Sequence, residues 1–175
     1  MAHTTSSVSK ASKVAVGKYL TFVLGHEAYG MPVLKVREII RLCELTTVPK
    51  LPDYIKGVIN LRGKIIPVVD LRVKFALVDT QNTEHTCIVV VDVVMPEKGP
   101  AQMGLIVDAV EEVVNIASAD IEPRPDFGMT VDADYILGMA KVKGKVKGLL
   151  DIDKVVTAMS PGKLGLEAIF GAEQK

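Results

Sequence analysis

The 175-residue sequence predicts an all-β fold with a few short helices, and two observations support this class. Short runs rich in Val and Ile are separated by Gly, Pro and Asp at close intervals, which is typical of a β-barrel or sandwich. The chain also repeats itself once, which indicates two similar β units. The expected strands are Tyr19–Leu24, Gly57–Leu61, Lys64–Val69, Cys87–Val94, Gln102–Val107 and Ile136–Val142.

The repeat is clearest where Asp53–Gly57 (DYIKG) recurs as Asp134–Gly138 (DYILG), and the match continues at a constant spacing, without a gap, through both hairpins. Upstream, Gly30–Ile40 resembles Gly104–Val114 at a slightly smaller spacing. We therefore expect one domain over residues 18–157, made of duplicated halves at about 18–83 and 84–157 that are able to exchange strands. Residues 1–17 are expected to form a flexible tail, and residues 158–175 a C-terminal helix or tail.

Each half is centred on one predicted hairpin. Gly63 and Gly144 accept the positive φ that a tight turn requires. Asp70 and Asp151 close the second strand and are expected to cap the helical turn that follows. Pro67 lacks an N–H group, so its strand is expected to be a sheet edge or to carry a bulge. Helical turns are expected at Val33–Ile40, after Asp70, after Asp153 and at Lys163–Phe170.

Composition excludes several functional classes. Hydrophobic residues make up 49% of the chain, which indicates a globular protein, and 21 basic residues balance 21 acidic residues. This balance disfavours binding to nucleic acid or to an anionic membrane. No apolar run reaches the roughly 18 to 20 residues that cross a bilayer and no signal-peptide core is present, so a cytoplasmic location is expected. Cys43 and Cys87 lack metal or redox spacing and are expected to be buried, inert thiols.

No motif predicts catalysis, a metal or a cofactor. His3, His26 and His85 lie in the tail or in turns without the spacing of metal ligands, and no phosphate-binding or nucleophile motif occurs. Glu111 and Glu112 are expected to face solvent on a turn or helix. The chain is therefore predicted to be no enzyme, with no cofactor and no small-molecule substrate.

Lysines alternate with apolar residues in Lys141–Lys147, which predicts a hairpin with one cationic face. A solvated outer face is the default explanation of this pattern, and a docking surface for an acidic patch is the more specific alternative. Nucleic acid is the weakest interpretation, because no aromatic side chain interleaves with these lysines to stack on bases.

The segment Ile55–Arg72 (IKGVINLRGKIIPVVDLR) resembles the signature hairpin of the CheW family of bacterial chemotaxis coupling proteins. Tyr29–Ile39, Gly104–Asp108, Ile121–Pro123 and Tyr135–Gly138 are similar to the same family in the same order. The resemblance implies two five-stranded SH3-like β-barrels packed on a shared hydrophobic seam. It also implies a signal-transduction adaptor that couples chemoreceptors to the histidine kinase CheA within membrane-associated receptor arrays, without inserting into the membrane.

The resemblance further implies two sets of contact residues. The set facing the cytoplasmic tips of chemoreceptors is Val36, Glu38 and Ile39 in a first helical turn, with Gly57, Asn60 and Arg62 in the hairpin. The set facing the regulatory domain of CheA is Cys43, Leu45, Lys56 and Ile65. Simpler local roles stay open at this point, namely core packing for Val36 and Ile39 and a surface ion pair between Glu38 and Arg62.

Two other functions remain alternatives. One alternative is the CheW-like regulatory module of a larger kinase, of a CheV-like fusion or of another two-component system, and the length of the chain counts against a fused kinase or receiver module. The second alternative is a small barrel that binds a ligand or single-stranded nucleic acid in the manner of an OB fold. The scarcity of aromatic residues and the zero net charge count against the second alternative.

Overall fold

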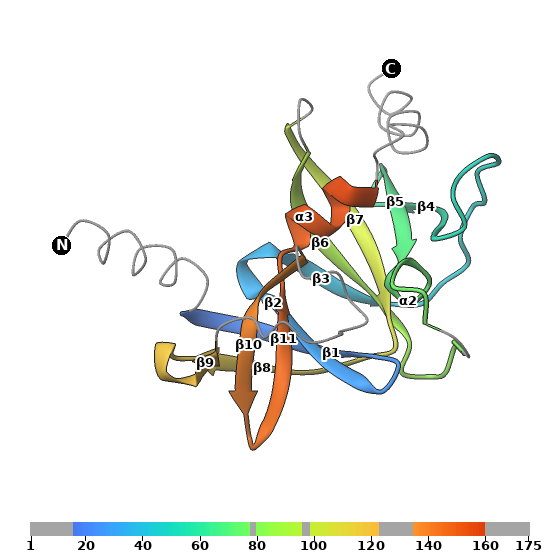
Figure 1. The fold of residues 1–175 in the computed structure, drawn as a ribbon. Coiled ribbons are helices and arrows are strands. Elements are labelled where there is room, and N and C mark those ends of the chain that lie inside the picture. The colour runs from blue at the N-terminus through green and yellow to red at the C-terminus, as the bar shows by residue number, and fades with distance from the viewer. Residues whose placement is uncertain (1–15, 78–79, 96–98, 123–134, 160–175) are drawn as a thin grey trace.

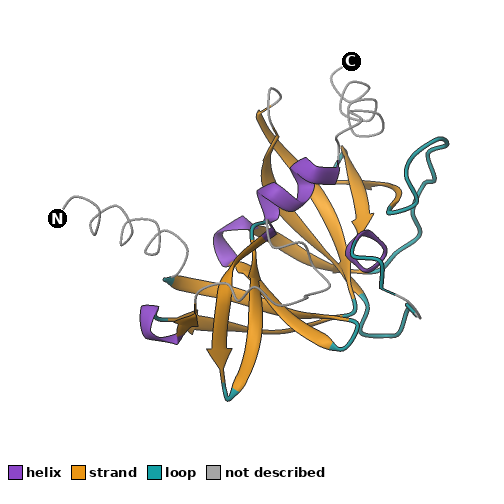
Figure 2. Cartoon of the chain, viewed as in Figure 1, coloured by secondary structure: helices purple, strands orange, loops and turns teal. Residues whose placement is uncertain are grey.

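The computed structural model of the chain describes residues 16–77, 80–95, 99–122 and 135–159 (Figure 1). Its strands are β1 (Gly17–Leu24), β2 (Glu27–Pro32), β3 (Val36–Arg41), β4 (Ile55–Leu61), β5 (Lys64–Asp70), β6 (Cys87–Met95), β7 (Gly99–Val107), β8 (Ala109–Ile116), β9 (Ile121–Glu122), β10 (Ile136–Val142) and β11 (Lys145–Leu150). The helices are η1 (Val33–Lys35), α2 (Leu71–Lys74), η2 (Ser118–Asp120) and α3 (Ile152–Met159). Figure 2 shows that helices are few and short, which confirms the predicted all-β class.

The strands form two mixed sheets, with orders β8-β1-β2-β11-β10-β9 and β3-β6-β7-β5-β4. The strands β1, β2 and β3 of the first half occupy the positions that β6, β7 and β8 occupy in the second half, and the hairpin β4–β5 occupies the position of β10–β11. In each sheet a hairpin pairs in parallel with a strand from the other half, at Leu149 opposite Gly30 and at Val68 opposite Gly104. Each sheet is therefore built from both halves of the chain.

Both predicted hairpins form with two-residue turns. Arg62 and Gly63 have φ values of 54° and 84°, and Lys143 and Gly144 have φ values of 52° and 80°. Positive φ at both central positions matches the right-handed twist of the flanking strands. The predicted caps also form, since Asp70 Oδ1 accepts a hydrogen bond from the Arg72 amide at 3.0 Å.

Pro67 lies inside the sheet, so the prediction that its strand forms a sheet edge or carries a bulge there is wrong. The register shift of this hairpin lies on β4, between Ile55 and Gly57, and Pro67 pairs with Val58 in regular register. The order of the sheet places β4 at the edge and β5 between β4 and β7. Pairing with β7 begins only at Val68, and Pro67 is the last residue that has a single neighbouring strand. The missing N–H group therefore costs the sheet no hydrogen bond.

The predicted helix over Val33–Ile40 is also wrong for most of its length. Only η1 is helical, and the residues from Val36 to Arg41 form β3, which pairs with β6. Half-buried and exposed residues alternate along this segment, so its apolar residues follow the period of a strand and its β-branched side chains favour extended backbone.

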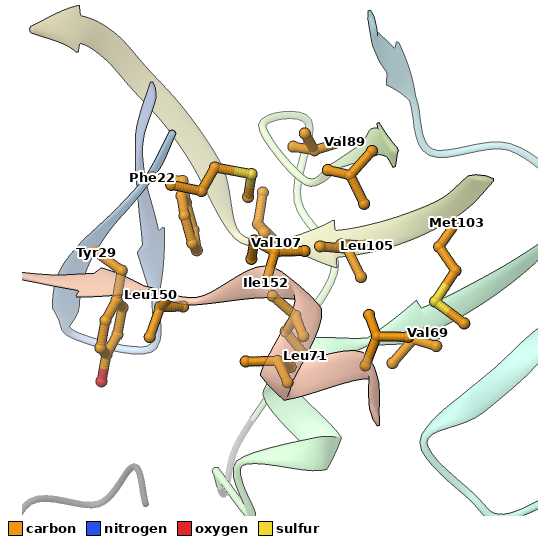
Figure 3. Close-up of a cluster of buried hydrophobic side chains, with 14 of the residues drawn as sticks. Phe22, Tyr29, Val69, Leu71, Val89, Met103, Leu105, Val107, Leu150 and Ile152 are labelled. Atoms are coloured by element: carbon orange, nitrogen blue, oxygen red, sulfur yellow. The ribbon is translucent and has the colours of Figure 1, made fainter. Parts of the chain in front are cut away.

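Buried side chains form three clusters. One lies inside the sheet that contains β3 to β7 and includes Ile59, Ile66, Val68, Ile88, Val90 and Ile106. A second lies inside the other sheet and includes Tyr19, Ile116, Ala140, Val142 and Leu149. The largest joins both sheets with α2 and α3, and Figure 3 shows Phe22, Leu105 and Ile152 meeting in it. This third cluster is the shared hydrophobic seam that the resemblance implied.

Some predictions lie partly or wholly outside the described residues. These are the tail predicted over residues 1–17, His3 and the helix Lys163–Phe170. The tail prediction is wrong at its last residue, because Gly17 begins β1 and pairs with Ile116.

Cys43 is exposed, so the prediction of a buried thiol is wrong there, because Leu42 and Leu45 on either side of it pack on the buried cluster in its place. Cys87 is half-buried, and burial raises the pKa of its thiol.

Candidate partner-binding surface

An ion pair between Glu38 and Arg62 marks the centre of the candidate surface. Glu38 lies on β3 and Arg62 in the β4–β5 turn, at opposite edges of the sheet order, so curvature of the sheet brings the two edges together. The guanidinium donates to both carboxylate oxygens, with Nη1 on Oε1 and with Nη2 3.1 Å from Oε2. This hydrogen bonding lowers the pKa of Glu38 below its usual value of 4.5.

A pocket of about 390 Å³ opens beside this ion pair. Its lining is Arg37, Glu38, Leu61, Arg62, Lys64, Val90 and Gln102. Three of these side chains are cationic and one is anionic. Arg37 Nε lies 3.6 Å from the Asp92 carboxylate outside the pocket, and Arg62 is largely exposed. The pocket therefore suits a partner that carries a carboxylate or carbonyl groups.

Two apolar side chains are exposed on the strands β3 and β5. Ile39 is 45% exposed on β3, and Ile65 is 37% exposed on β5. Val36, by contrast, is half-buried and packs against the seam. Core packing therefore explains the apolar side chain at Val36 in part, whereas the side chains of Ile39 and Ile65 are available to a partner.

Gly57 and Asn60 fix the backbone that carries the surface. Gly57 is buried with a φ of 148°, and a Cβ atom there would lie 2.3 Å from the Thr46 carbonyl oxygen. This close approach allows Thr46 and Val58 to exchange two backbone hydrogen bonds, of 3.0 and 2.9 Å. Asn60 Oδ1 accepts a hydrogen bond from the Gly63 amide at 2.9 Å, which fixes the hairpin turn.

The four residues predicted to face the kinase have different surroundings. Cys43 and Lys56 are exposed, whereas Leu45 packs on the cluster inside the barrel. Ile65 lies directly opposite Asn60 across the β4–β5 pair. The two predicted sets of contact residues therefore meet on a single hairpin.

The lysine-rich hairpin is mostly neutralised by the protein itself. Lys141 lies 3.0 Å from Glu122, Lys143 2.8 Å from Glu112 and Lys147 2.9 Å from Glu111. Both predictions made for these residues need correction. Lys147 is buried where a solvated face was expected, and Glu111 and Glu112 lie on β8 where a turn or helix was expected. The physical reason is the curvature of the sheet, which turns β8 towards the β10–β11 hairpin.

A buried charge network at Arg72 was missed by the sequence analysis. Its Nε donates to Asp70 at 2.9 Å, its Nη1 to Asp108 at 3.1 Å and its Nη2 to Asn82 at 2.8 Å. Asp108 also accepts a hydrogen bond from the Gly25 amide at 2.7 Å. The Asp-Leu-Arg sequence at the end of β5 offered a signal only for Asp70, because Asn82 lies 10 residues and Asp108 36 residues from Arg72.

A metal-binding cluster is absent from the part of the chain that the structure describes. Within it, no group of three or more His, Cys, Asp or Glu side chains could hold a metal ion. His26 and His85 are both exposed. No helix among the described residues is long and apolar enough to span a membrane.

Paired β-barrels that share one hydrophobic core and carry exposed apolar side chains and an exposed ion pair are typical of a protein that presents surfaces to partners. A family model for the CheW-like domain matches residues 18–159. The chemotaxis protein CheW of Klebsiella aerogenes is 37% identical over 154 residues, which cover 87% of this chain and 90% of that protein. CheW of Rhizobium meliloti is 29% identical, covering 78% of this chain and 84% of that protein.

A solved structure agrees with these sequence relatives. The crystal structure of the scaffolding protein TtCheW from Thermoanaerobacter tengcongensis is similar with a TM-score of 0.72 and 35% identity, covering 80% of this chain and 92% of that one. The chain belongs to the CheW family and is a chemotaxis coupling protein, a non-catalytic scaffold.

Proposed function

We propose that this chain couples chemoreceptors to the histidine kinase CheA by binding a receptor tip at the Glu38–Arg62 surface. The observation that carries the proposal is the two-point ion pair at a pocket lined by three cationic side chains, with Ile39 exposed on the strand that carries Glu38. A receptor tip is an α-helical hairpin, and such a partner presents apolar side chains beside carboxylates and helix-terminal carbonyls. We propose that this binding takes place in the cytoplasm, beneath receptor arrays.

Within this proposal, Glu38 and Arg62 have different tasks. Arg62 is exposed enough to reach a partner while one edge of its guanidinium stays hydrogen-bonded to Glu38. Glu38 holds the planar guanidinium in one orientation before the partner arrives, which reduces the entropy lost on binding. Gly57 and Asn60 act indirectly, because they hold the hairpin and the Thr46 segment in place.

The kinase would bind the neighbouring face of the same hairpin. Cys43, Lys56 and Ile65 are exposed and are proposed as direct contacts, and Leu45 supports the segment that presents Cys43. A scaffold that holds two partners at a fixed separation raises their effective concentration for each other. We therefore propose that coupling arises from placement of receptor and kinase on adjacent surfaces of one rigid barrel.

Co-sedimentation with receptor-containing vesicles and CheA tests this proposal. Arg62→Glu is expected to abolish most receptor capture while the protein stays folded, and Ile65→Asp is expected to weaken CheA capture with receptor capture retained. Lys18→Glu is the matched control, since it makes the same change of charge at an exposed residue of β1. Full receptor capture by a folded Arg62→Glu protein would remove Arg62 from the site.

A further inference from the structure

Helix α2 is tied to the opposite sheet through an ion pair. Arg72 lies in α2, directly after β5, and its Nη1 donates to Asp108 at 3.1 Å. Asp108 lies between β7 and β8, where the chain passes from one sheet to the other. Its carboxylate also accepts a hydrogen bond at 2.7 Å from the amide of Gly25, which follows β1 in the other sheet. We call these three residues the first latch, because together they connect the two sheets.

Helix α3 is tied to its opposite sheet in the same way. Asp153 lies in α3, after β11, and its Oδ2 accepts from Lys35 Nζ at 2.7 Å. Lys35 lies between β2 and β3, where the chain also passes between the sheets. The Asp153 carboxylate accepts a second hydrogen bond, at 3.0 Å, from the amide of Val94 on β6, and Figure 1 shows α3 beside this strand. These three residues form the second latch.

The side chains of the two latches occupy equivalent places in the internal repeat. Arg72 and Asp153 are separated by the same number of residues as the two turn glycines. Lys35 and Asp108 both lie in the segment that connects one sheet to the other, at adjacent positions when the repeat is aligned. Each latch therefore joins the helix that follows a hairpin to a connecting segment from the other half of the chain.

The backbone amides that the two carboxylates bind are also equivalent. Thr21 on β1 and Val90 on β6 pair with the matching glycines of β2 and β7. Gly25 lies four residues after Thr21, and Val94 lies four residues after Val90. Both latches therefore end at the same point of equivalent strands.

The charges of the two latches are reversed. In the first latch the helix supplies the cation, Arg72, and the connecting segment supplies the anion, Asp108. In the second latch the helix supplies the anion, Asp153, and the connecting segment supplies the cation, Lys35. The first half of the chain is therefore positive at both of its charged latch positions, and the second half is negative at both.

This distribution of charge favours pairing between unlike halves. The two halves are similar and each supplies strands to both sheets, so equal halves of two copies contain the strands needed to pair with each other. Two first halves would place Arg72 against Lys35, and two second halves would place Asp153 against Asp108. The four side chains are only 4% to 33% exposed, so like charges at these positions would oppose such pairing.

We propose that the two latches form a recognition device, which joins the first half of the chain to the second half and rejects the equal half of a second copy. Selection against a wrong partner requires a repulsive contact that forms only in the wrong assembly. The latches meet this requirement, because the native assembly brings only opposite charges together at these positions. The device acts while the halves assemble, since each sheet needs strands from both.

Refolding of a charge-swapped chain tests the device. Lys35→Glu combined with Asp153→Lys gives the second latch the signs of the first, so like and unlike halves then bring opposite charges together equally. The full chain is refolded from urea at several protein concentrations, and monomer and dimer are separated by size-exclusion chromatography with light scattering. At equal concentration we expect at least about tenfold more dimer from the swapped chain than from the native chain. Urea unfolding of the swapped monomer should stay close to native, because its ion pair is restored.

Lys143→Glu combined with Glu112→Lys is the matched control. It reverses an ion pair of 2.8 Å whose residues both belong to the second half and to one sheet, so this variant should refold to monomer as the native chain does. A native yield of monomer from the swap at Lys35 and Asp153 would overturn the proposal. Equal yields of dimer from this swap and from the control would overturn it as well.

A second comparison, between Lys35→Glu and Lys35→Met, tests the device if the swapped chain folds poorly. Both substitutions remove the native ion pair with Asp153, and only the glutamate offers an opposite charge to Arg72 of a second copy. We therefore expect more dimer from Lys35→Glu than from Lys35→Met after refolding. The same amount of dimer from both would contradict the proposal, because loss of the native ion pair alone would then explain it.

Discussion

Gly57→Ala tests whether the close approach of Thr46 to β4 supports the candidate surface. The new Cβ atom would lie 2.3 Å from the Thr46 carbonyl oxygen, a backbone atom that moves only if its whole segment moves. Movement would break the hydrogen bonds that Thr46 and Val58 exchange. Each such bond contributes about 0.5 to 1.5 kcal/mol net, so their loss should cost about 1 to 3 kcal/mol.

Gly17→Ala is the matched control for backbone strain. Gly17 has a φ of 142°, close to the 148° of Gly57, and no atom lies within 4 Å of the Cβ position there. Both substitutions therefore carry the strain of an unfavourable φ, about 1 to 3 kcal/mol, and only Gly57→Ala adds the collision. We expect the free energy of unfolding in urea to fall further for Gly57→Ala than for Gly17→Ala, by at least about 1 kcal/mol. Equal losses for the two proteins would refute the argument.

Three further substitutions follow from the charges. Arg72→Met leaves the buried carboxylate of Asp70 without its cation, so unfolding free energy should fall by about 3 to 5 kcal/mol in urea denaturation. Lys147→Met should lower the free energy of unfolding by less than about 1 kcal/mol, or raise it, in thermal denaturation. The reason is that the equivalent position of the first barrel holds an apolar buried residue, Ile66. Arg62→Gln should raise the pKa of Glu38 towards 4.5 in NMR titration. In the native protein the hydrogen bonds from Arg62 keep the Glu38 carboxylate charged until the pH falls below that value.

The sequence predicted those features that local residue chemistry determines. Gly63 and Gly144 located both turns, because few other residues adopt their φ. Asp70 located the start of α2 for a similar reason, since its carboxylate caps the helix. The internal repeat predicted two equivalent hairpins, and the pairing of Val68 with Gly104 shows that they are exchanged between sheets.

Features that depend on distant parts of the chain could not be predicted in the same way. Nothing in the sequence around Thr46 indicates that it forms a β-bridge with Val58, which is possible only because Gly57 has no side chain. Burial of Lys147 depends on Glu111, which approaches only after the sheet curves. The ion pair of Glu112 with Lys143 was accessible in principle, because the two spacings of the repeat, applied to Glu38 and Arg62, lead to those residues.

The central claim is that one chain holds a receptor and a kinase together through separate surfaces. Its most direct test is the amount of CheA that sediments with receptor-containing vesicles as this protein is added. We predict that CheA recruitment rises with the added protein, and that it falls with Arg62→Glu because the receptor contact is lost. The same CheA recruitment without the protein, or with Arg62→Glu in its place, would contradict the claim.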